Sequence, residues 1–260
     1  MVFKPQPIST LGKKYDSSLN IIGKNRFYKC FRLKDYLFFF AEFKKIKMLH
    51  KIQNIKSLTE STYIIRMDRN KFEFRAGQYL SLGMPDDVNM REYSIYSGID
   101  DPFLEVLIKE VKEGDVSVLL KKSKIGQALN VEGPYGFFTL NDNDIENREF
   151  LFLASGTGIS PFHSFIYSYP NLNYKLIHGI RFINEAYEKS SYSSSRYIAA
   201  TSKDARGNFH GRLTRYLKNQ ELKTDTLCYL CGNVDMIHDA YDILQEKGIP
   251  VDQIHSEVYF

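Results

Sequence analysis

The sequence is poor in cysteine and in long apolar stretches. It has three cysteines, Cys30, Cys228 and Cys231, in 260 residues, and no apolar run approaches the roughly 20 residues that a helix needs to cross a bilayer. The tightest apolar cluster, Tyr36–Phe43, is interrupted by Glu42. Sparse cysteines without an apolar secretory segment are typical of a reducing compartment. We therefore expect a cytoplasmic protein without an integral membrane segment.

Several motifs of metal binding and catalysis are also missing. Cys228 and Cys231 have CxxC spacing, but the chain has neither a second zinc-ligand pair nor the C-x4-C-x2-C pattern of plant-type iron–sulfur proteins. The histidines include no i, i+4 pair of the zinc-protease type, so each is expected to be a packing or surface residue. Neither a G-x-S-x-G elbow nor a P-loop lysine occurs. These absences disfavour a metal site and the hydrolase and nucleoside triphosphatase classes.

Positive charge is concentrated near the amino-terminal end. Residues 1–47 carry 11 Lys and Arg against 3 Asp and Glu, a net charge of +8, whereas the whole chain carries +4. The basic residues are not interleaved with a recognisable binding motif, so we expect no nucleic-acid partner. We interpret residues 1–47 as a basic extension. The alternatives for it are disorder, an artefact of an upstream start, and a tail for targeting or docking.

The segment from Lys51 to Phe138 has the signals of an antiparallel sheet. Stretches such as TYIIRM and QYLSLGM are rich in β-branched and aromatic residues, and glycine or proline separates them. One interruption, GDVSVLLKKS, places Val116, Leu119 and Leu120 on one face of a helix. Short strands at this spacing are typical of a closed barrel, and we expect residues 48–141 to form one.

After this barrel the pattern changes to alternating strands and helices. Glu149–Ser155 is a continuous apolar run of the kind found in buried parallel strands, and GTGISP follows it. YKLIHGIR, RYIAATS and TLCYLCGN are further candidate strands, and the last precedes a helical pattern that ends at Gly248. We expect residues 142–260 to form an α/β domain with a parallel sheet.

The turn GTGISP is the strongest sign of a ligand site. Gly156 and Gly158 let backbone N–H groups approach a phosphate, and Pro161 suits the first turn of the helix whose positive end faces it. Because Pro161 replaces the third glycine of the usual dinucleotide fingerprint, a standard Rossmann site is not indicated. A tight strand-to-helix turn without a ligand is the alternative.

Cations follow the next two predicted strands. A site for NAD has an acidic residue at such a position to hold the ribose 2′-hydroxyl, whereas here Arg181 ends the strand and the next loop supplies further basic groups. This pattern favours a 2′-phosphate and hence NADP. The alternative for each cation is solvated surface charge. The loop residues concerned are Ser202, Lys203, Arg206 and Arg212.

The chain ends in an aromatic pair, Tyr259 and Phe260. These residues are either frayed surface or a planar face for an aromatic ligand, with Glu257 close behind. Cys231 ends a predicted strand at the edge where parallel sheets bind ligands, so it is a further candidate. Cys228 points to the opposite face of that strand and is expected in the core.

Taken together, these stretches resemble the ferredoxin (flavodoxin) NADP reductase family, in its bacterial two-domain, FAD-dependent form. The resemblance runs from about Leu49 to Phe260. It rests on motifs in the order FRAGQYLSL, REYS, GDVS, EGPYGFF, ASGTGISP, HGIR, CGN and EVYF. The resemblance implies an FAD-binding β-barrel followed by an NADP-binding α/β domain.

The resemblance also implies the FAD contacts. Arg91 is expected to bind the FAD pyrophosphate, Tyr93 to pack against the flavin and ribityl chain, and Ser94 to lie near flavin N5. In a strand, Arg91 and Tyr93 share a face, whereas Ser94 points the other way and needs a local twist to reach N5. The other implied FAD contacts are Leu107, Ile108, Lys109, Val116, Ser117, Thr157 and one of the terminal aromatics, Tyr259 or Phe260, stacked over the flavin.

The NADP contacts and the catalytic groups follow from the same resemblance. The implied NADP contacts are Gly156, Thr157, Gly158, Arg181, Ser202, Lys203, Arg212, Gly232 and Asn233. Lys203 stands where family members often have arginine, and this loss of a bidentate fork weakens the case for strict NADP preference. Ser94, Cys231 and Glu257 match the polar residues that orient the nicotinamide and assist proton movement.

The activity implied is electron transfer between NADPH and ferredoxin or flavodoxin, by hydride transfer at flavin N5. The candidate residues for docking an acidic carrier by charge are Lys109, Lys112, Lys121, Lys122 and Lys124. One alternative is a flavin reductase or oxygenase reductase component that uses NADH or NADPH. Another is a non-catalytic subunit that binds FAD and senses redox state.

Overall fold

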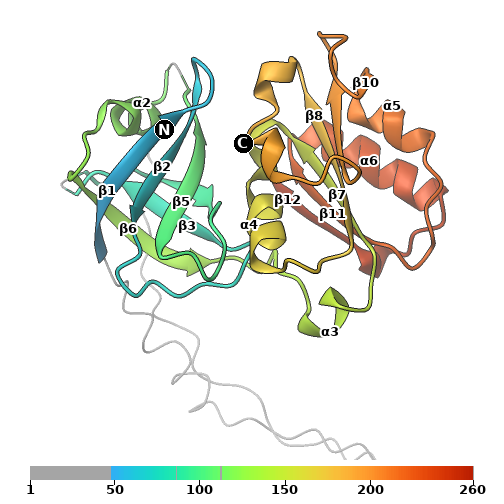
Figure 1. Ribbon diagram of the computed structural model, residues 1–260, viewed down its shortest axis with the longest axis horizontal. Coiled ribbons are helices and arrows are strands. Elements are labelled where there is room, and N and C mark those ends of the chain that lie inside the picture. The colour runs from blue at the N-terminus through green and yellow to red at the C-terminus, as the bar shows by residue number, and fades with distance from the viewer. Residues whose placement is uncertain (1–47, 86, 112, 260) are drawn as a thin grey trace, which may run out of the picture. The chain divides into compact units, whose positions relative to one another are not determined.

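The computed structural model describes residues 48–260 except residues 86, 112 and 260. These residues form an antiparallel sheet followed along the chain by a parallel sheet with helices (Figure 1). The predicted basic extension, Lys112 and Phe260 lie outside the described residues. The predicted domain boundary after residue 141 falls at the start of α3 (Asp142–Ile145), between the two sheets, and stays a prediction.

The antiparallel sheet forms the predicted barrel. Its strand order is β4-β3-β6-β1-β2-β5. A β-bridge between Ile95, just after β4, and Val106 of β5 joins the first and last strands of that order. The strands are β1 (Met48–Ser57), β2 (Thr62–Asp68), β3 (Tyr79–Gly83), β4 (Met90–Ser94), β5 (Phe103–Lys109) and β6 (Ala128–Tyr135).

Helix α2 (Asp115–Lys122) packs on the barrel core. Val116 and Leu120 are buried there with the strand residues, but Leu119 is 42% exposed. The predicted helix is observed, and Val116, Leu119 and Leu120 share one of its faces. The buried side of the helix is centred on Val116, Ser117 and Leu120, so Leu119 lies at the solvent edge of that face.

The second sheet has the order β10-β9-β8-β7-β11-β12, and all its strand pairs are parallel, as predicted. The edge strand β12 was not predicted, because its five residues, IHSEV, show neither an apolar run nor a regular alternation and are only half-buried. The strands are β7 (Phe150–Ser155), β8 (Tyr174–Ile180), β9 (Tyr197–Thr201), β10 (Phe209–His210), β11 (Leu227–Gly232) and β12 (Ile254–Val258).

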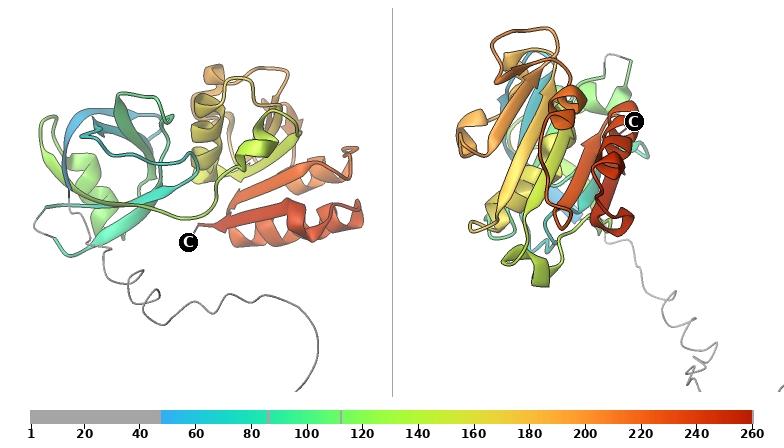
Figure 2. Two further views of the ribbon diagram at one scale, coloured as in Figure 1. Left: turned by 90° about the horizontal axis from the view of Figure 1, so that it is seen from below. Right: turned by 90° about the vertical axis from the view of Figure 1, so that its right-hand side faces the viewer.

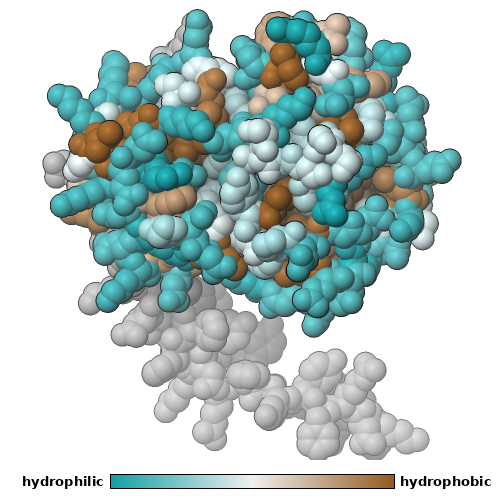
Figure 3. All heavy atoms as spheres, viewed as in Figure 1, coloured by the Kyte–Doolittle hydropathy of each residue, from teal (hydrophilic) through white to brown (hydrophobic). Residues whose placement is uncertain are grey.

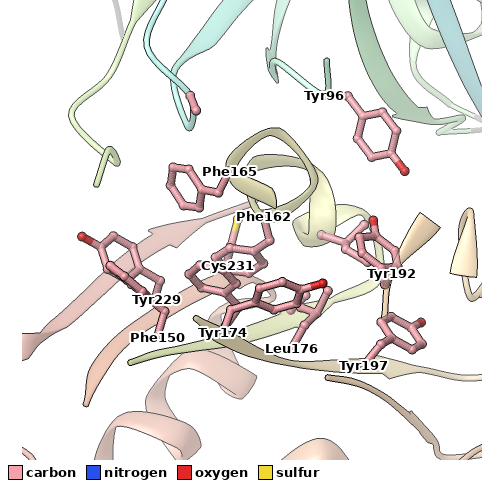
Figure 4. Close-up of a cluster of buried hydrophobic side chains, with 14 of the residues drawn as sticks. Tyr96, Phe150, Phe162, Phe165, Tyr174, Leu176, Tyr192, Tyr197, Tyr229 and Cys231 are labelled. Carbon is pink, nitrogen blue, oxygen red and sulfur yellow. The ribbon is translucent and has the colours of Figure 1, made fainter. Parts of the chain in front are cut away.

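Helices cover both faces of the parallel sheet (Figure 2). Helix α4 (Ser160–Ser168) packs on one face, in a cluster of aromatic side chains that also includes barrel residues (Figure 4). Helices α5 (Leu213–Lys218) and α6 (Val234–Glu246) pack on the other face. Cys231 belongs to the α4 side and Cys228 to the α5 and α6 side, which confirms that the two thiols point in opposite directions.

Candidate functional site

A cavity of about 560 Å³ opens at the carboxyl-terminal edge of the parallel sheet. Open α/β sheets bind ligands at this edge, because the loops that follow the strands converge there. Strand ends contribute Ser155, Ile180 and Gly232, and the barrel contributes Lys109 at the end of β5. Seven of the nine predicted NADP residues line the cavity, and Gly158 and Lys203 do not.

The glycine turn forms one wall of the cavity. Gly156 and Thr157 line it and begin the 3-10 helix η1 (Gly156–Ile159), which runs into α4. Gly158 packs so closely on β11 that a Cβ built on it would lie 2.3 Å from the Cys231 carbonyl oxygen. The first N–H groups of a helix have no partner within the helix, so this turn fits an anionic group in the cavity.

Two of the predicted cations, Arg181 and Arg212, line the cavity, and they differ in whether their charge is already paired. Arg181 is 53% exposed and donates from Nε and Nη2 to Glu185 at 3.1 and 2.6 Å. Burial raises the pKa of Glu185, but the hydrogen bonds and the charge of Arg181 lower it, and the net shift of the pKa is downward. Arg212 lines the cavity, and its guanidinium makes no hydrogen bond or ion pair with the described residues. Arg206 pairs with Asp204, away from the lining.

A hydrogen-bonded network joins the barrel to the end of the chain beside this cavity. The Tyr259 hydroxyl donates to Ser94 Oγ at 2.6 Å, and Ser94 Oγ donates to Glu257 Oε2 at 3.3 Å. The Tyr259 N–H donates to the Gly232 carbonyl at 2.8 Å. Cys231 pairs with Glu257 in the register of β11 and β12, and its thiol interacts with Tyr259. The three predicted catalytic residues are thus brought together around Tyr259.

Near neutral pH the Tyr259 hydroxyl and the Cys231 thiol of this network are uncharged, whereas the Glu257 carboxyl group changes its charge there. Burial raises the pKa of Glu257 to about 7, against a lowering effect of the Ser94 hydrogen bond, and the neighbouring charge of Glu92 raises it further. Burial also raises the pKa of both Tyr259 and Cys231. A carboxyl group that exchanges its proton near neutral pH is suited to acid–base work.

The REYS stretch lies where β4 pairs with β3. Arg91 and Tyr93 stand opposite Leu82 and Leu80, so they share one face, as the alternation of the strand requires. Tyr93 packs against the barrel core, and burial raises its pKa to about 12, whereas Arg91 is exposed. Ser94 ends the strand on the other face, where Glu257 and Tyr259 meet it.

The other predicted FAD residues lie at the end of β5 and the start of α2. Leu107 and Ile108 are buried, and Lys109 reaches the cavity. Gly114 precedes α2 without a side-chain cap, so the first N–H groups of this helix, near Val116 and Ser117, can receive a phosphate. The uncapped helix start and the glycine turn together fit the phosphates of FAD and NADP.

Some residues of the cavity were not predicted from the sequence. Glu185 and Tyr187 come from the loop after β8, and Asp235 and Asp239 come from α6. Of these four residues, only Glu185 could have been found from the sequence, because its i, i+4 spacing from Arg181 suggests an ion pair. Within the part of the chain that the structure describes, no group of three or more His, Cys, Asp or Glu is placed to hold a metal ion.

Residues 49–140 match the family of oxidoreductase FAD-binding domains. The flavodoxin/ferredoxin–NADP reductase of Buchnera aphidicola subsp. Schizaphis graminum is 29% identical over 230 residues, which cover 75% of this chain and 89% of the relative. The toluate 1,2-dioxygenase electron transfer component of Pseudomonas putida is 26% identical, over 80% of this chain and 66% of that protein.

The fold is also found in a crystal structure of a ferredoxin NADP+ reductase from Neisseria gonorrhoeae with bound FAD and NADP. Its TM-score is 0.74 at 24% sequence identity, and the match covers 82% of this chain and 99% of the other. Both sheets of the chain therefore occur together in the fold of that reductase.

Proposed function

We propose that this chain, an FAD-dependent NAD(P)H oxidoreductase of the ferredoxin–NADP reductase family, passes electrons between NADPH and a ferredoxin or flavodoxin. The observation that carries the proposal is the meeting of three features at one cavity. The glycine turn, the cation Arg212 and Tyr259 come from distant parts of the chain and line the same cavity, and Tyr259 links it to Ser94 and Glu257 through hydrogen bonds.

The barrel residues are proposed to hold FAD. Arg91 binds its pyrophosphate, the N–H groups at the start of α2 bind its phosphates, and Tyr93 packs against the ring and ribityl chain. Bound FAD supplies the chemistry, because it accepts a hydride and returns electrons singly. Tyr259 is the aromatic residue that we assign to the flavin face, since its hydroxyl is anchored to Ser94.

The α/β residues are proposed to hold NADPH. The N–H groups of the turn at Thr157 bind its phosphates, and Arg181, Ser202 and Arg212 surround the 2′-phosphate. Ser94, Cys231 and Glu257 orient the nicotinamide, and Glu257 holds and releases a proton at its carboxyl group. The chain thus contributes orientation, charge and proton exchange, which are the contributions expected of a protein around such cofactors.

Replacing Arg212 with alanine tests the phosphate site. We expect R212A to raise the KM for NADPH by about 10-fold to 100-fold, because a charge-assisted hydrogen bond contributes roughly 1.5 to 3 kcal/mol. The KM for NADH, which lacks the phosphate, should stay unchanged. Steady-state kinetics with an artificial acceptor measures both values.

The matched control is Arg215→Ala, an exposed arginine in the helix that Arg212 precedes, and it does not line the cavity. R215A should leave both KM values within about 2-fold of the unchanged protein. Equal effects of the two substitutions would mean that Arg212 acts only through general surface charge.

The reduced positive charge at the cavity favours a second candidate function, in which NADH is accepted as well as NADPH. Arg181 is partly neutralised by Glu185, and Lys203 does not line the cavity, so the cavity wall carries less positive charge than three free cations would supply. The chain is also similar to an oxygenase electron transfer component. A reductase component that accepts NADH as well as NADPH is therefore the alternative.

The carrier is proposed to dock through lysines near α2. Lys121 is engaged by Glu110, so it offers less charge than the sequence implied. Lys122 and Lys124 are exposed and are the better candidates, along with Lys109 at the cavity. On the face seen in Figure 3 hydrophilic side chains predominate, which fits a carrier that binds by charge.

No helix of the described residues is long and apolar enough to cross a membrane.

The proposed function is tested with the purified full-length chain. A yellow protein whose flavin is bleached by NADPH, and faster than by NADH, is expected. Ferredoxin, flavodoxin and an oxygenase-type iron–sulfur protein are then compared as acceptors. A preparation without flavin would contradict the proposal, and equal bleaching by both nucleotides would favour the oxygenase-reductase alternative.

A further inference from the structure

His178 lies on β8 directly behind the glycine turn, and its side chain is completely buried. One ring nitrogen, Nε2, lies 2.8 Å from the carbonyl oxygen of Gly156. The other, Nδ1, lies 2.9 Å from the hydroxyl of Tyr197 on β9. A histidine thus connects the sheet interior to the residue that begins the turn.

These two contacts determine which nitrogen carries the proton. A carbonyl oxygen can only accept, so Nε2 must donate to Gly156, and Nδ1 must then accept from the Tyr197 hydroxyl. Burial lowers the pKa of His178 to about 4, so the ring is neutral at ordinary pH. Tyr197 is itself held by stacking on Tyr192, with ring centroids 5.2 Å apart and planes at 6° (Figure 4).

The hydrogen bond to Gly156 also orients the next N–H group. In a trans peptide the carbonyl of one residue and the N–H of the next point in opposite directions. Because His178 holds the Gly156 carbonyl toward the interior, the Thr157 N–H is directed away from it, on the cavity side of the turn. Gly156 takes φ +54° there, and a Cβ built on it would meet no atom within 4 Å.

We propose that His178 is a positioning residue for the bound nucleotide: by holding the Gly156 carbonyl, it keeps the Thr157 N–H directed at the phosphates of NADP(H). This inference rests on the proposed function, because it assigns the nucleotide to this cavity. His178 does not itself line the cavity, so it acts through the peptide between Gly156 and Thr157.

The test compares two ligands on the flavin-loaded protein by calorimetry. NADP+ requires the glycine turn, whereas 2′-AMP requires only the cations around the 2′-phosphate. We expect His178→Phe, which keeps a ring but loses the donor, to weaken NADP+ binding by about 10-fold or more, the effect of one charge-assisted hydrogen bond. Affinity for 2′-AMP and flavin content should change little, whereas Tm should fall, because the Gly156 carbonyl and the Tyr197 hydroxyl lose their buried partner.

Two further variants separate positioning from packing. His178→Gln retains an N–H donor and should restore NADP+ affinity to within about 3-fold of the unchanged protein. Tyr197→Phe removes the group that fixes the tautomer and should weaken NADP+ binding by about 3-fold. If His178→Phe does not fold, these two variants carry the test.

The outcomes are distinguishable. Unchanged NADP+ affinity in His178→Phe and Tyr197→Phe would overturn the inference, as would an equal loss of NADP+ and 2′-AMP affinity in His178→Phe. In steady-state kinetics the inference requires a change in the KM for NADPH that exceeds the change in kcat. If the unchanged protein binds neither ligand, the proposed function itself fails, and the variants need not be compared.

Discussion

Glu257→Gln is expected to lower the rate at which NADPH bleaches the bound flavin by about 100-fold, within the range of 10²-fold to 10⁴-fold for loss of a positioned acid or base. Glutamine keeps the size of Glu257 and can accept the hydrogen bond from Ser94, but it cannot exchange a proton. Stopped-flow absorbance measures the rate at saturating NADPH. A rate within about 3-fold of the unchanged protein would remove Glu257 from the mechanism.

The protonation state of Glu257 determines whether the rate of flavin bleaching rises or falls with pH. Because the pKa of Glu257 is raised to about 7, the carboxyl group is protonated below that pH and charged above it. Forming the neutral reduced flavin would need one proton in addition to the hydride from NADPH, and the protonated carboxyl group of Glu257 would supply it, so we expect the rate to fall as the pH rises through about 7. This inflection should vanish in E257Q.

Glu92→Gln is the matched control for the pH profile. Glu92 is exposed on β4, and its charge helps to raise the pKa of Glu257. E92Q should therefore move the inflection to lower pH while leaving the rate at low pH unchanged. An inflection that stays in place would mean that another group titrates.

The same shift predicts a change in stability that does not depend on activity. The folded-state pKa of Glu257 is raised from 4.5 to about 7, so its stabilising contribution is present below about 4.5 and is lost as the pH rises through about 7. Relative to E257Q, the unchanged protein should therefore lose Tm between these pH values. Differential scanning calorimetry of the flavin-loaded proteins at pH 5 and pH 8 measures this difference.

Gly158→Ala is expected to destabilise the α/β half by about 3 kcal/mol or more, because the added Cβ has no room. The clash involves backbone, with the Cys231 carbonyl oxygen at 2.3 Å and the Gly232 Cα at 2.8 Å, so no side-chain rotation relieves it. The substitution must push β11 away from the glycine turn, and we expect nucleotide binding to fall as well. Urea denaturation measures the free energy of unfolding.

Gly156→Ala is the control for this clash. A Cβ at Gly156 meets nothing within 4 Å, but its φ of +54° is left-handed and costs an alanine about 1 to 2 kcal/mol. G156A should therefore lose less stability than G158A. Equal losses would show that the turn relaxes around either methyl group and that the close approach to β11 is not required.

Both sheets follow from patterns within the sequence. A barrel strand alternates residues between core and solvent, and the buried strand β7 is a continuous apolar run. The burial of these strands can therefore be predicted from the local order of apolar and polar residues. Strand β12 has no such pattern, because it is half-buried and its five residues contain no apolar run. The apolar pattern of α2 predicts the helix but does not show how far Leu119 is exposed.

The two-part fold, the glycine turn and the residue types suited to FAD and NADP can be predicted from the amino-acid sequence. Which of these groups come into contact depends on the tertiary structure. Ser94 and Tyr259 are 165 positions apart, and the contact between them depends on how the barrel packs on the sheet. Packing also paired Arg181 with Glu185, left Lys203 off the cavity and placed His178 behind the turn. The physical reason is that periodicity reports the face on which a residue lies, whereas contacts between distant segments depend on packing across the whole core.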